Sequence, residues 1–138
     1  MILTDAGPLI AIVDRGEQHH EACVGCLTKF TAPMLTSWPA FTEAMYFLGE
    51  AGGWHIQETL WTLCDQGKLE IADHDSQARL RMHKLMEKYQ DCPMDLADAS
   101  LVVLAEDRGL RDIFTLDQQD FSIYRIHGKQ PFRIWPQR

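Results

Sequence analysis

The stretch from residue 96 to residue 105, LADASLVVLA, is the feature that most restricts the fold of this chain. As a helix it would carry apolar side chains around almost its whole circumference, with the charge of Asp98 in its first turn. A helix of this kind has to be covered on all sides, so it is expected at the centre of a domain. Short apolar runs alternate with helical stretches elsewhere, which is typical of an α/β domain with a mainly parallel sheet.

The expected strands are the apolar runs at residues 1–4, 33–36, 68–72, 112–115 and 132–135. The last is expected at a sheet edge, because Pro131 and Pro136 flank it. Helical spacing of apolar residues covers residues 17–31, 55–65 and 77–89. Ser37 is a candidate N-cap for a further helix that ends near residues 49–53, and Gly7-Pro8 is expected to turn the chain. No linker or repeat divides the sequence, so residues 1–138 are expected to form one domain.

Charge and cysteine content narrow the range of functions. The net charge is −7, with 13 basic against 20 acidic residues, which argues against a broad basic surface for nucleic acid. Cys23 and Cys26 form a C-x-x-C pair, but Cys64 and Cys92 stand alone, so free thiols are favoured over a zinc or redox site. Neither an export signal nor an apolar run long enough for a membrane span is found, so a cytoplasmic protein is expected.

Several carboxylates follow the predicted strands. Asp5 comes directly after the first strand, and Asp117 follows the fourth, with Asp120 three residues later. Because ligands of open parallel sheets bind beyond the carboxyl ends of the strands, these acids are expected on one rim. Glu43 lies one to two turns into the helix after the second strand, and Asp98 lies in the first turn of the central helix. Both should reach the same rim.

Carboxylates gathered in one cleft repel one another, and a divalent cation relieves that repulsion. Hard oxygen ligands suit Mg²⁺ or Mn²⁺, which can activate a water molecule and neutralise charge on a phosphodiester. This arrangement predicts a metal-dependent nuclease.

Each acid also has a purely structural interpretation. Asp95 is a good N-cap after Pro93, which would place Asp98 where the helix dipole favours an anion. Glu43 could be a solvated helix residue, and the segment from Asp117 to Asp120 could shape a turn. These explanations are independent of one another, whereas one metal site accounts for all the acids together.

Four segments together resemble the PIN domain, in particular the VapC-type toxin ribonucleases. They are LTDAGPLIAI, TSWPAFTEAMYFL, MDLADASLVVLAE and FTLDQQDF, in that order, and the resemblance covers residues 2 to about 135. It implies a three-layer fold with a mainly parallel sheet flanked by helices, and cleavage of RNA assisted by Mg²⁺ or Mn²⁺. One departure is Ala6, where relatives often carry a small polar residue.

The resemblance also implies roles for individual residues. Asp5, Glu43, Asp98 and Asp117 match the acidic quartet, with Asp120 and Asp95 as further candidate metal ligands. Thr4, Ser37 and Thr115 adjoin the acids and are expected to orient them or a bound water. The family further implies a homodimer and an antitoxin, for which the aromatic helices from Trp38 to Trp61 could supply surfaces; equally, those aromatic residues could be core.

Contacts to RNA would need local basic groups. One candidate set lies in a predicted helix and another near the C-terminus with Phe132 and Trp135; the basic residues are Arg79, Arg81, Lys84, Lys88, Arg125, Lys129, Arg133 and Arg138. An ordinary solvated helix face and edge strand explain them equally well. Two other functions are alternatives to a nuclease. A phosphatase with a nucleophilic aspartate would want a second acid where Gly7 stands, and a non-catalytic PIN-like module would bind only RNA or protein.

Overall fold

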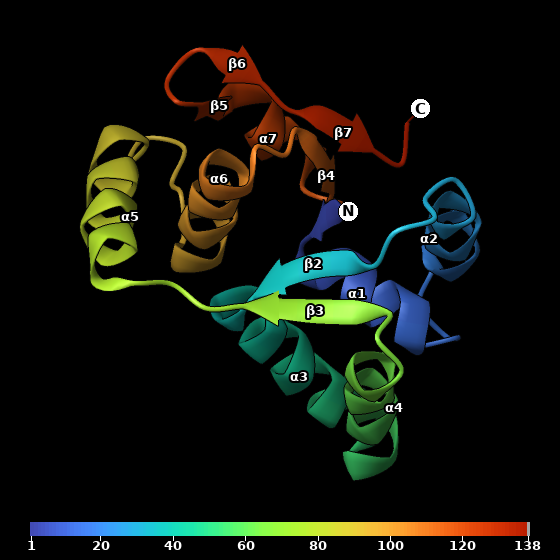
Figure 1. Ribbon diagram of the computed structural model, residues 1–138. Coiled ribbons are helices and arrows are strands. Elements are labelled where there is room, and N and C mark those ends of the chain that lie inside the picture. Colours follow the sequence, from blue (N-terminus) through green and yellow to red (C-terminus); the bar gives the residue numbers. More distant parts are fainter. Residues whose placement is uncertain (138) are drawn as a thin grey trace.

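Five parallel strands form the central sheet of the computed structural model, which describes residues 1–137 (Figure 1). Their order across the sheet is β3-β2-β1-β4-β7. The strands are β1 (Ile2–Thr4), β2 (Met34–Ser37), β3 (Leu69–Ala72), β4 (Asp112–Phe114) and β7 (Arg133–Trp135). A small antiparallel pair, β5 (Arg125–Ile126) and β6 (Gln130–Pro131), stands apart from this sheet.

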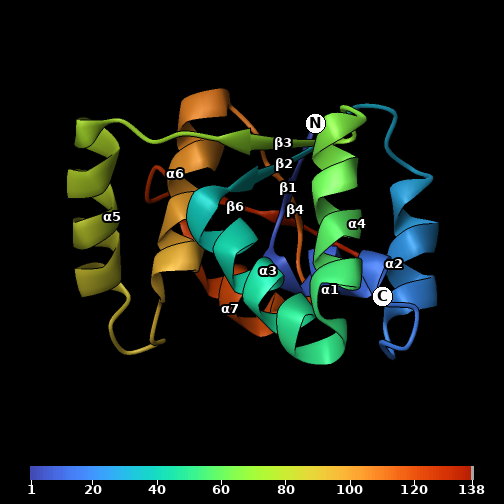
Figure 2. The same ribbon diagram turned by 90° about the horizontal axis from the view of Figure 1, so that it is seen from below.

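Helices cover both faces of the sheet (Figure 2). They are α1 (Ala6–Val13), α2 (His20–Leu27), α3 (Trp38–Gly52), α4 (Trp54–Asp65), α5 (Ser76–Lys88), α6 (Leu96–Arg108) and α7 (Gln118–Ile123). Alternate residues of the strands enter two separate cores, as expected for a pleated sheet covered on both sides. Leu3 packs with α6, whereas its neighbour Ile2 packs with α1, α3 and α4. The predicted α/β fold with a parallel sheet flanked by helices is confirmed.

Helix α6 is the central helix that its apolar circumference predicted. It is buried from Ala97 to Ala105 and packs against both α3 and α5. Asp95 caps its N-terminus by accepting a hydrogen bond from the Asp98 backbone N–H at 2.8 Å. This places Asp98 in the first turn, at the end of the helix that faces the rim of the sheet.

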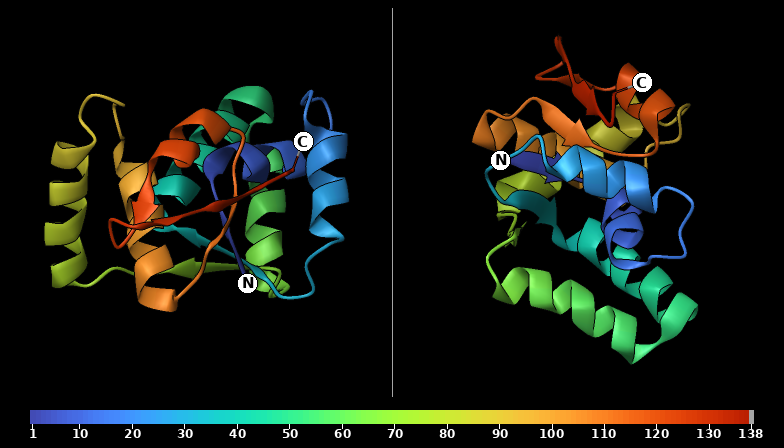
Figure 3. Two further views of the ribbon diagram at one scale, coloured as in Figure 1. Left: turned by 90° about the horizontal axis from the view of Figure 1, so that it is seen from above. Right: turned by 90° about the vertical axis from the view of Figure 1, so that its right-hand side faces the viewer.

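The chain differs from the sequence-based prediction in three places. Gly7-Pro8 does not turn the chain: both residues lie in the first turn of α1, where a proline needs no N–H partner. Helix α2 is shorter than predicted, and α7 with the β5–β6 pair was not predicted. Strand β7 does occupy an edge, and Figure 3 shows it far from the α3–α4 pair.

The four cysteines are unpaired, as expected. Burial raises the pKa of the Cys23 thiol to about 11 and that of Cys26 in the same direction, so both are neutral thiols at physiological pH. Within residues 1–137, no helix is both long enough and apolar enough to cross a membrane.

Candidate active site

Asp5 lies where β1 ends and α1 begins, and its side chain is held from two sides. Oδ1 accepts a hydrogen bond from the Ala6 backbone N–H at 2.8 Å, and Oδ2 accepts one from the Thr115 hydroxyl at 2.9 Å. Only 4% of the residue is exposed. Asp5 therefore acts as the N-cap of α1 and is fixed in orientation by a residue 110 positions away in the chain.

Asp98 is the second buried acid, with 6% of its surface exposed. The hydroxyl of Tyr124 donates a hydrogen bond to its Oδ2 at 2.8 Å. The nearby start of α3 is tied to α6 by the hydroxyls of Ser37 and Ser100, 2.6 Å apart. This hydrogen bond thus links the starts of α3 and α6, the two helices that carry Glu43 and Asp98.

Asp117 follows β4 and lies at the surface, at the start of α7. Its backbone N–H donates to the Thr115 hydroxyl at 3.0 Å, and that hydroxyl donates to Asp5. Asp120 is one turn further along α7, in a polar hollow lined by residues 116–120. The segment after β4 therefore brings Asp117 to Asp5 through one shared hydroxyl.

Glu43 and Asp95 form the opposite side of the site. Both line an open groove between the start of α3 and the start of α6, together with Trp38, Pro39, Thr42, Tyr46, Leu96 and Ala97. Trp38 is 44% exposed, and its Nε1–H donates to Asp73 at 2.8 Å. The groove is mostly apolar and ends at two carboxylates.

The pKa values indicate that these acids lie close enough for their charges to interact. Burial raises the pKa of Asp5 to about 7, opposed by its two hydrogen bonds and increased by the charges of Asp117 and Glu43. Burial likewise raises the pKa of Asp98 to about 8, opposed by Tyr124 and increased by Asp95, Asp5 and Asp117.

The two more accessible acids respond in the same direction. Burial raises the pKa of Glu43, and the charges of Asp95 and Asp117 add to it. The pKa of Asp117 is raised by burial, then by Asp120 and Asp95. Acids from four separate segments thus lie close enough for their charges to interact, and each has a raised pKa. A nearby cation would lower these pKa values again.

The structure separates the three hydroxyls expected beside the acids. Thr115 contacts Asp5, as described. Thr4 donates to the Ile2 carbonyl oxygen, and Ser37 contacts Ser100 and the Ala40 N–H; neither of these hydrogen bonds involves a carboxylate. Tyr124 was not predicted, because a buried aromatic residue in one sequence gives no sign of where its hydroxyl will point.

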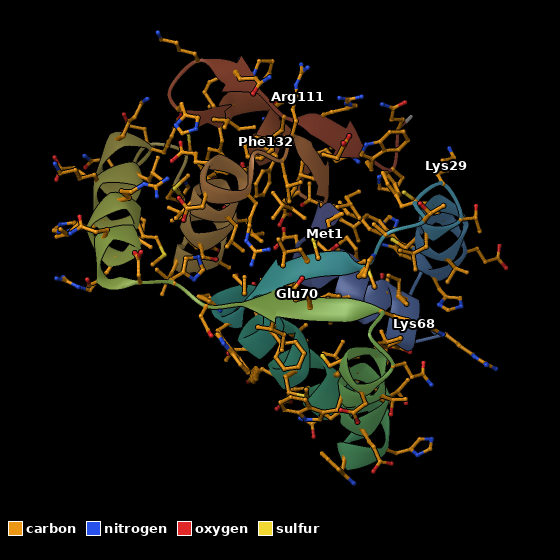
Figure 4. The ribbon with its side chains drawn as sticks, viewed as in Figure 1. Met1, Lys29, Lys68, Glu70, Arg111 and Phe132 are labelled. Atoms are coloured by element: carbon orange, nitrogen blue, oxygen red, sulfur yellow. The ribbon has the colours of Figure 1, made fainter. Side chains whose placement is uncertain are left out.

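Some of the basic and aromatic candidates for RNA contact are engaged within the protein, whereas Arg79, Lys84, Lys88 and Lys129 are exposed. Arg81 pairs with Glu106 and Asp107, and Arg133 pairs with Asp112. Phe132 is 7% exposed, so the prediction that its side chain contacts RNA is wrong. Arg138 lies outside the described residues. Lys68 directly precedes β3, at the opposite end of the strand from the acid rim, and Lys29 lies just after α2 (Figure 4).

Carboxylate oxygens are the ligand type that Mg²⁺ and Mn²⁺ prefer, so the chemistry of the donor set fits these ions. Within residues 1–137, no three His, Cys, Asp or Glu side chains are placed so that they could together hold a metal ion. Mg²⁺ commonly binds through one or two carboxylates and keeps several waters, so a loosely spaced acid set still suits it.

A parallel sheet with acids gathered beyond its strand ends defines the class: an α/β protein with an acidic rim. No protein-family model matches the chain. The sequence is 27% identical to Ribonuclease VapC26 of Mycobacterium tuberculosis over 135 residues, covering 98% of this chain and all of that protein.

Solved structures show the same fold. The Mycobacterium tuberculosis VapC20 structure, a toxin that cleaves the Sarcin-Ricin loop, superposes with a TM-score of 0.75 at 12% identity, covering 82% of this chain and 87% of VapC20. A toxin-antitoxin complex from Klebsiella pneumoniae gives 0.68 at 19% identity, covering 89% and 92%. The resemblance to VapC-type PIN-domain proteins is therefore confirmed, in sequence along the whole chain and in fold.

Proposed function

We propose that this protein is an endoribonuclease, the toxin of a type II toxin-antitoxin pair, acting in the cytoplasm as one domain of residues 1–138. The likeness to Ribonuclease VapC26 supports the ribonuclease activity. The observation that carries the active site is that Asp5, Glu43, Asp98 and Asp117, from four separate segments, all have raised pKa values, to which burial and then the charges of neighbouring acids contribute.

In the proposed mechanism, one or two of the acids Asp5, Glu43, Asp98 and Asp117 would bind Mg²⁺ or Mn²⁺ directly, and the others would bind its waters. The ion would supply an activated water and neutralise charge on the phosphodiester. Ala6 and Thr115 fix Asp5, and Tyr124 fixes Asp98, so the two buried acids present set orientations. Glu43 is more accessible than these two and has a raised pKa, so its carboxylate is suited to take up a proton from the attacking water.

We assign the fourth acid to Asp117 rather than Asp120. The charge of Asp117 raises the pKa of Asp5, Glu43 and Asp98, whereas the charge of Asp120 acts on Asp117 and Tyr124. Asp95 is already engaged as the cap of α6, so it contributes negative charge to the groove more than a ligand.

The proposed partner is an antitoxin, bound together with a second copy of the chain. Exposed apolar side chains on α3 and α4, namely Tyr46, Phe47, Trp54 and Trp61, offer such a surface. The Klebsiella pneumoniae neighbour is a toxin-antitoxin complex, which supports this part of the proposal.

The groove beside Glu43 is a suitable place for a nucleotide next to the cleaved bond. Trp38 is held there by Asp73 and by an edge-on contact with Phe41, at 5.8 Å between ring centroids. A fixed, exposed indole can stack on an unpaired base, which is worth about 1–3 kcal/mol per base.

Trp38→Ala is therefore expected to raise KM for single-stranded RNA about tenfold or more, because one stacked base is lost, with a smaller change in kcat. Steady-state cleavage of a short labelled RNA measures both constants. Val24→Ala is the control, since Val24 is also exposed but lies on α2, outside the groove and outside the proposed partner surface. An unchanged KM for Trp38→Ala would remove RNA from this groove.

The activity itself is tested with Asp98→Asn on structured RNA, in Mn²⁺ and then in EDTA. Loss of one charged ligand is expected to reduce cleavage on the order of a thousandfold, and EDTA should abolish wild-type cleavage. Equal cleavage in all conditions would refute the assignment. RNA binding without cleavage by the wild type would favour a non-catalytic binding module, for which the loose spacing of the acids is the supporting observation.

A further inference from the structure

Tyr124 is fully buried, yet its hydroxyl reaches the acid cleft and donates to Asp98 Oδ2 at 2.8 Å. We propose that Tyr124 is a positioning residue, which occupies Oδ2 of Asp98 so that Oδ1 alone is presented to the divalent cation. This inference rests on the proposed metal-dependent function and adds a residue to it.

The free oxygen follows from the hydrogen bonds. Within residues 1–137, Asp98 Oδ1 makes no hydrogen bond, whereas no buried side-chain oxygen or nitrogen in that part of the chain lacks a partner. Oδ1 must therefore be the atom through which Asp98 keeps its 6% exposure. One carboxylate oxygen is satisfied by protein and the other is left for a ligand from the cleft.

The Tyr124 ring is held firmly enough to fix the hydroxyl. Its centroid lies 5.1 Å from that of Tyr89 and 5.0 Å from that of Phe121, both in edge-on contact. These ring contacts leave the Tyr124 side chain little freedom, so packing sets the position of its hydroxyl.

Asp5 also receives a hydroxyl from this part of the chain, although its second oxygen, unlike Oδ1 of Asp98, accepts the Ala6 N–H. Thr115 donates to Oδ2 of Asp5, and Thr115 and Tyr124 flank the short segment that contains Asp117 and α7. One ten-residue stretch, 115–124, thus provides a hydroxyl for each buried acid as well as the fourth carboxylate. Partners of metal-binding carboxylates typically alter metal affinity 10–100-fold when removed.

The alternative is that the hydroxyl only satisfies a buried carboxylate and contributes stability alone. Tyr124→Phe separates the two, because the ring and its packing remain while the hydroxyl is lost. Tyr89→Phe is the matched control: it removes a hydroxyl from the same aromatic cluster, but one bonded to backbone and to no acid. The melting temperature of each variant establishes that it folds.

The experiment titrates Mn²⁺ alone into wild type, Tyr124→Phe, Tyr89→Phe and Asp98→Asn by calorimetry, and then measures single-turnover RNA cleavage. Tyr124→Phe is expected to weaken Mn²⁺ binding about tenfold or more and to slow cleavage, with Tyr89→Phe staying within twofold of wild type in both. Mn²⁺ affinity and cleavage of Tyr124→Phe within twofold of wild type, or an equal loss in Tyr89→Phe, would overturn the positioning role.

The Asp98→Asn arm keeps this result separate from the proposed function. If wild type binds Mn²⁺ and Asp98→Asn does not, the metal site stands and the Tyr124 comparison decides its own question. If wild type binds no Mn²⁺, or Asp98→Asn binds it as wild type does, the metal site fails and the role of Tyr124 fails with it.

Discussion

Asp5→Asn is expected to reduce RNA cleavage on the order of a thousandfold, since several kcal/mol of metal-assisted stabilisation depend on the charged site, while raising the melting temperature of the metal-free protein at pH 8. Two opposite effects of one substitution follow from the same burial. The anion that the cation needs is costly for the fold when the cation is absent.

The sign of the stability effect comes from the raised pKa of Asp5. Burial moves its pKa from 3.8 to about 7, so its contribution to stability is complete below pH 3.8 and is lost as the pH rises through 7. Asparagine stays neutral and avoids this loss. The gain in melting temperature should therefore be largest at pH 8, smaller at pH 5 and absent only below about pH 3.8.

Thermal unfolding with EDTA at pH 5 and pH 8, together with cleavage assays in Mn²⁺, measures both effects. Asp65→Asn is the control, since Asp65 is exposed, lies at the end of α4 and is far in sequence from the acids. A lower melting temperature for Asp5→Asn at pH 8, or cleavage within tenfold of wild type, would contradict the prediction.

The affinity for Mn²⁺ is expected to fall on the order of a hundredfold between pH 8.5 and pH 6, because protons and the cation compete for the same carboxylates. The pKa values of Asp5 and Asp98, about 7 and about 8, place this competition in the neutral range instead of near pH 4. Exposed carboxylates with ordinary pKa values would show almost no change over this interval.

Calorimetric titration with Mn²⁺ at four pH values from 6 to 8.5 measures this dependence. Asp98→Asn removes one of the two titrating acids, so its residual Mn²⁺ affinity should change less steeply with pH. A wild-type affinity that is constant over the whole range would contradict the raised pKa values of the buried acids.

The sequence predicted the α/β fold because its strongest signals are local. The apolar circumference of α6, the N-cap at Ser37 and the prolines around β7 each depend on neighbouring residues. Gly7-Pro8 misled for the same reason: glycine and proline are usual turn formers, and the cap by Asp5 that favours a helix depends on tertiary placement.

The acids could be predicted as a set, because strand ends and helix starts meet at one rim. Their orienting groups could not. Thr115 is two residues before Asp117 in sequence but donates its hydrogen bond to Asp5. Tyr124 donates to Asp98, 26 residues away. Only the packing of the aromatic cluster determines which hydroxyl meets which carboxylate, and that packing is not encoded in any short motif.

The position of β4 beside β1 has a consequence for synthesis of the protein on the ribosome. Asp5 is translated 110 residues before Thr115, which orients its carboxylate. A nascent chain therefore carries an incomplete set of acids until Asp117 has been synthesised. In the proposed ribonuclease, the acids could act together only after β4 has paired with β1.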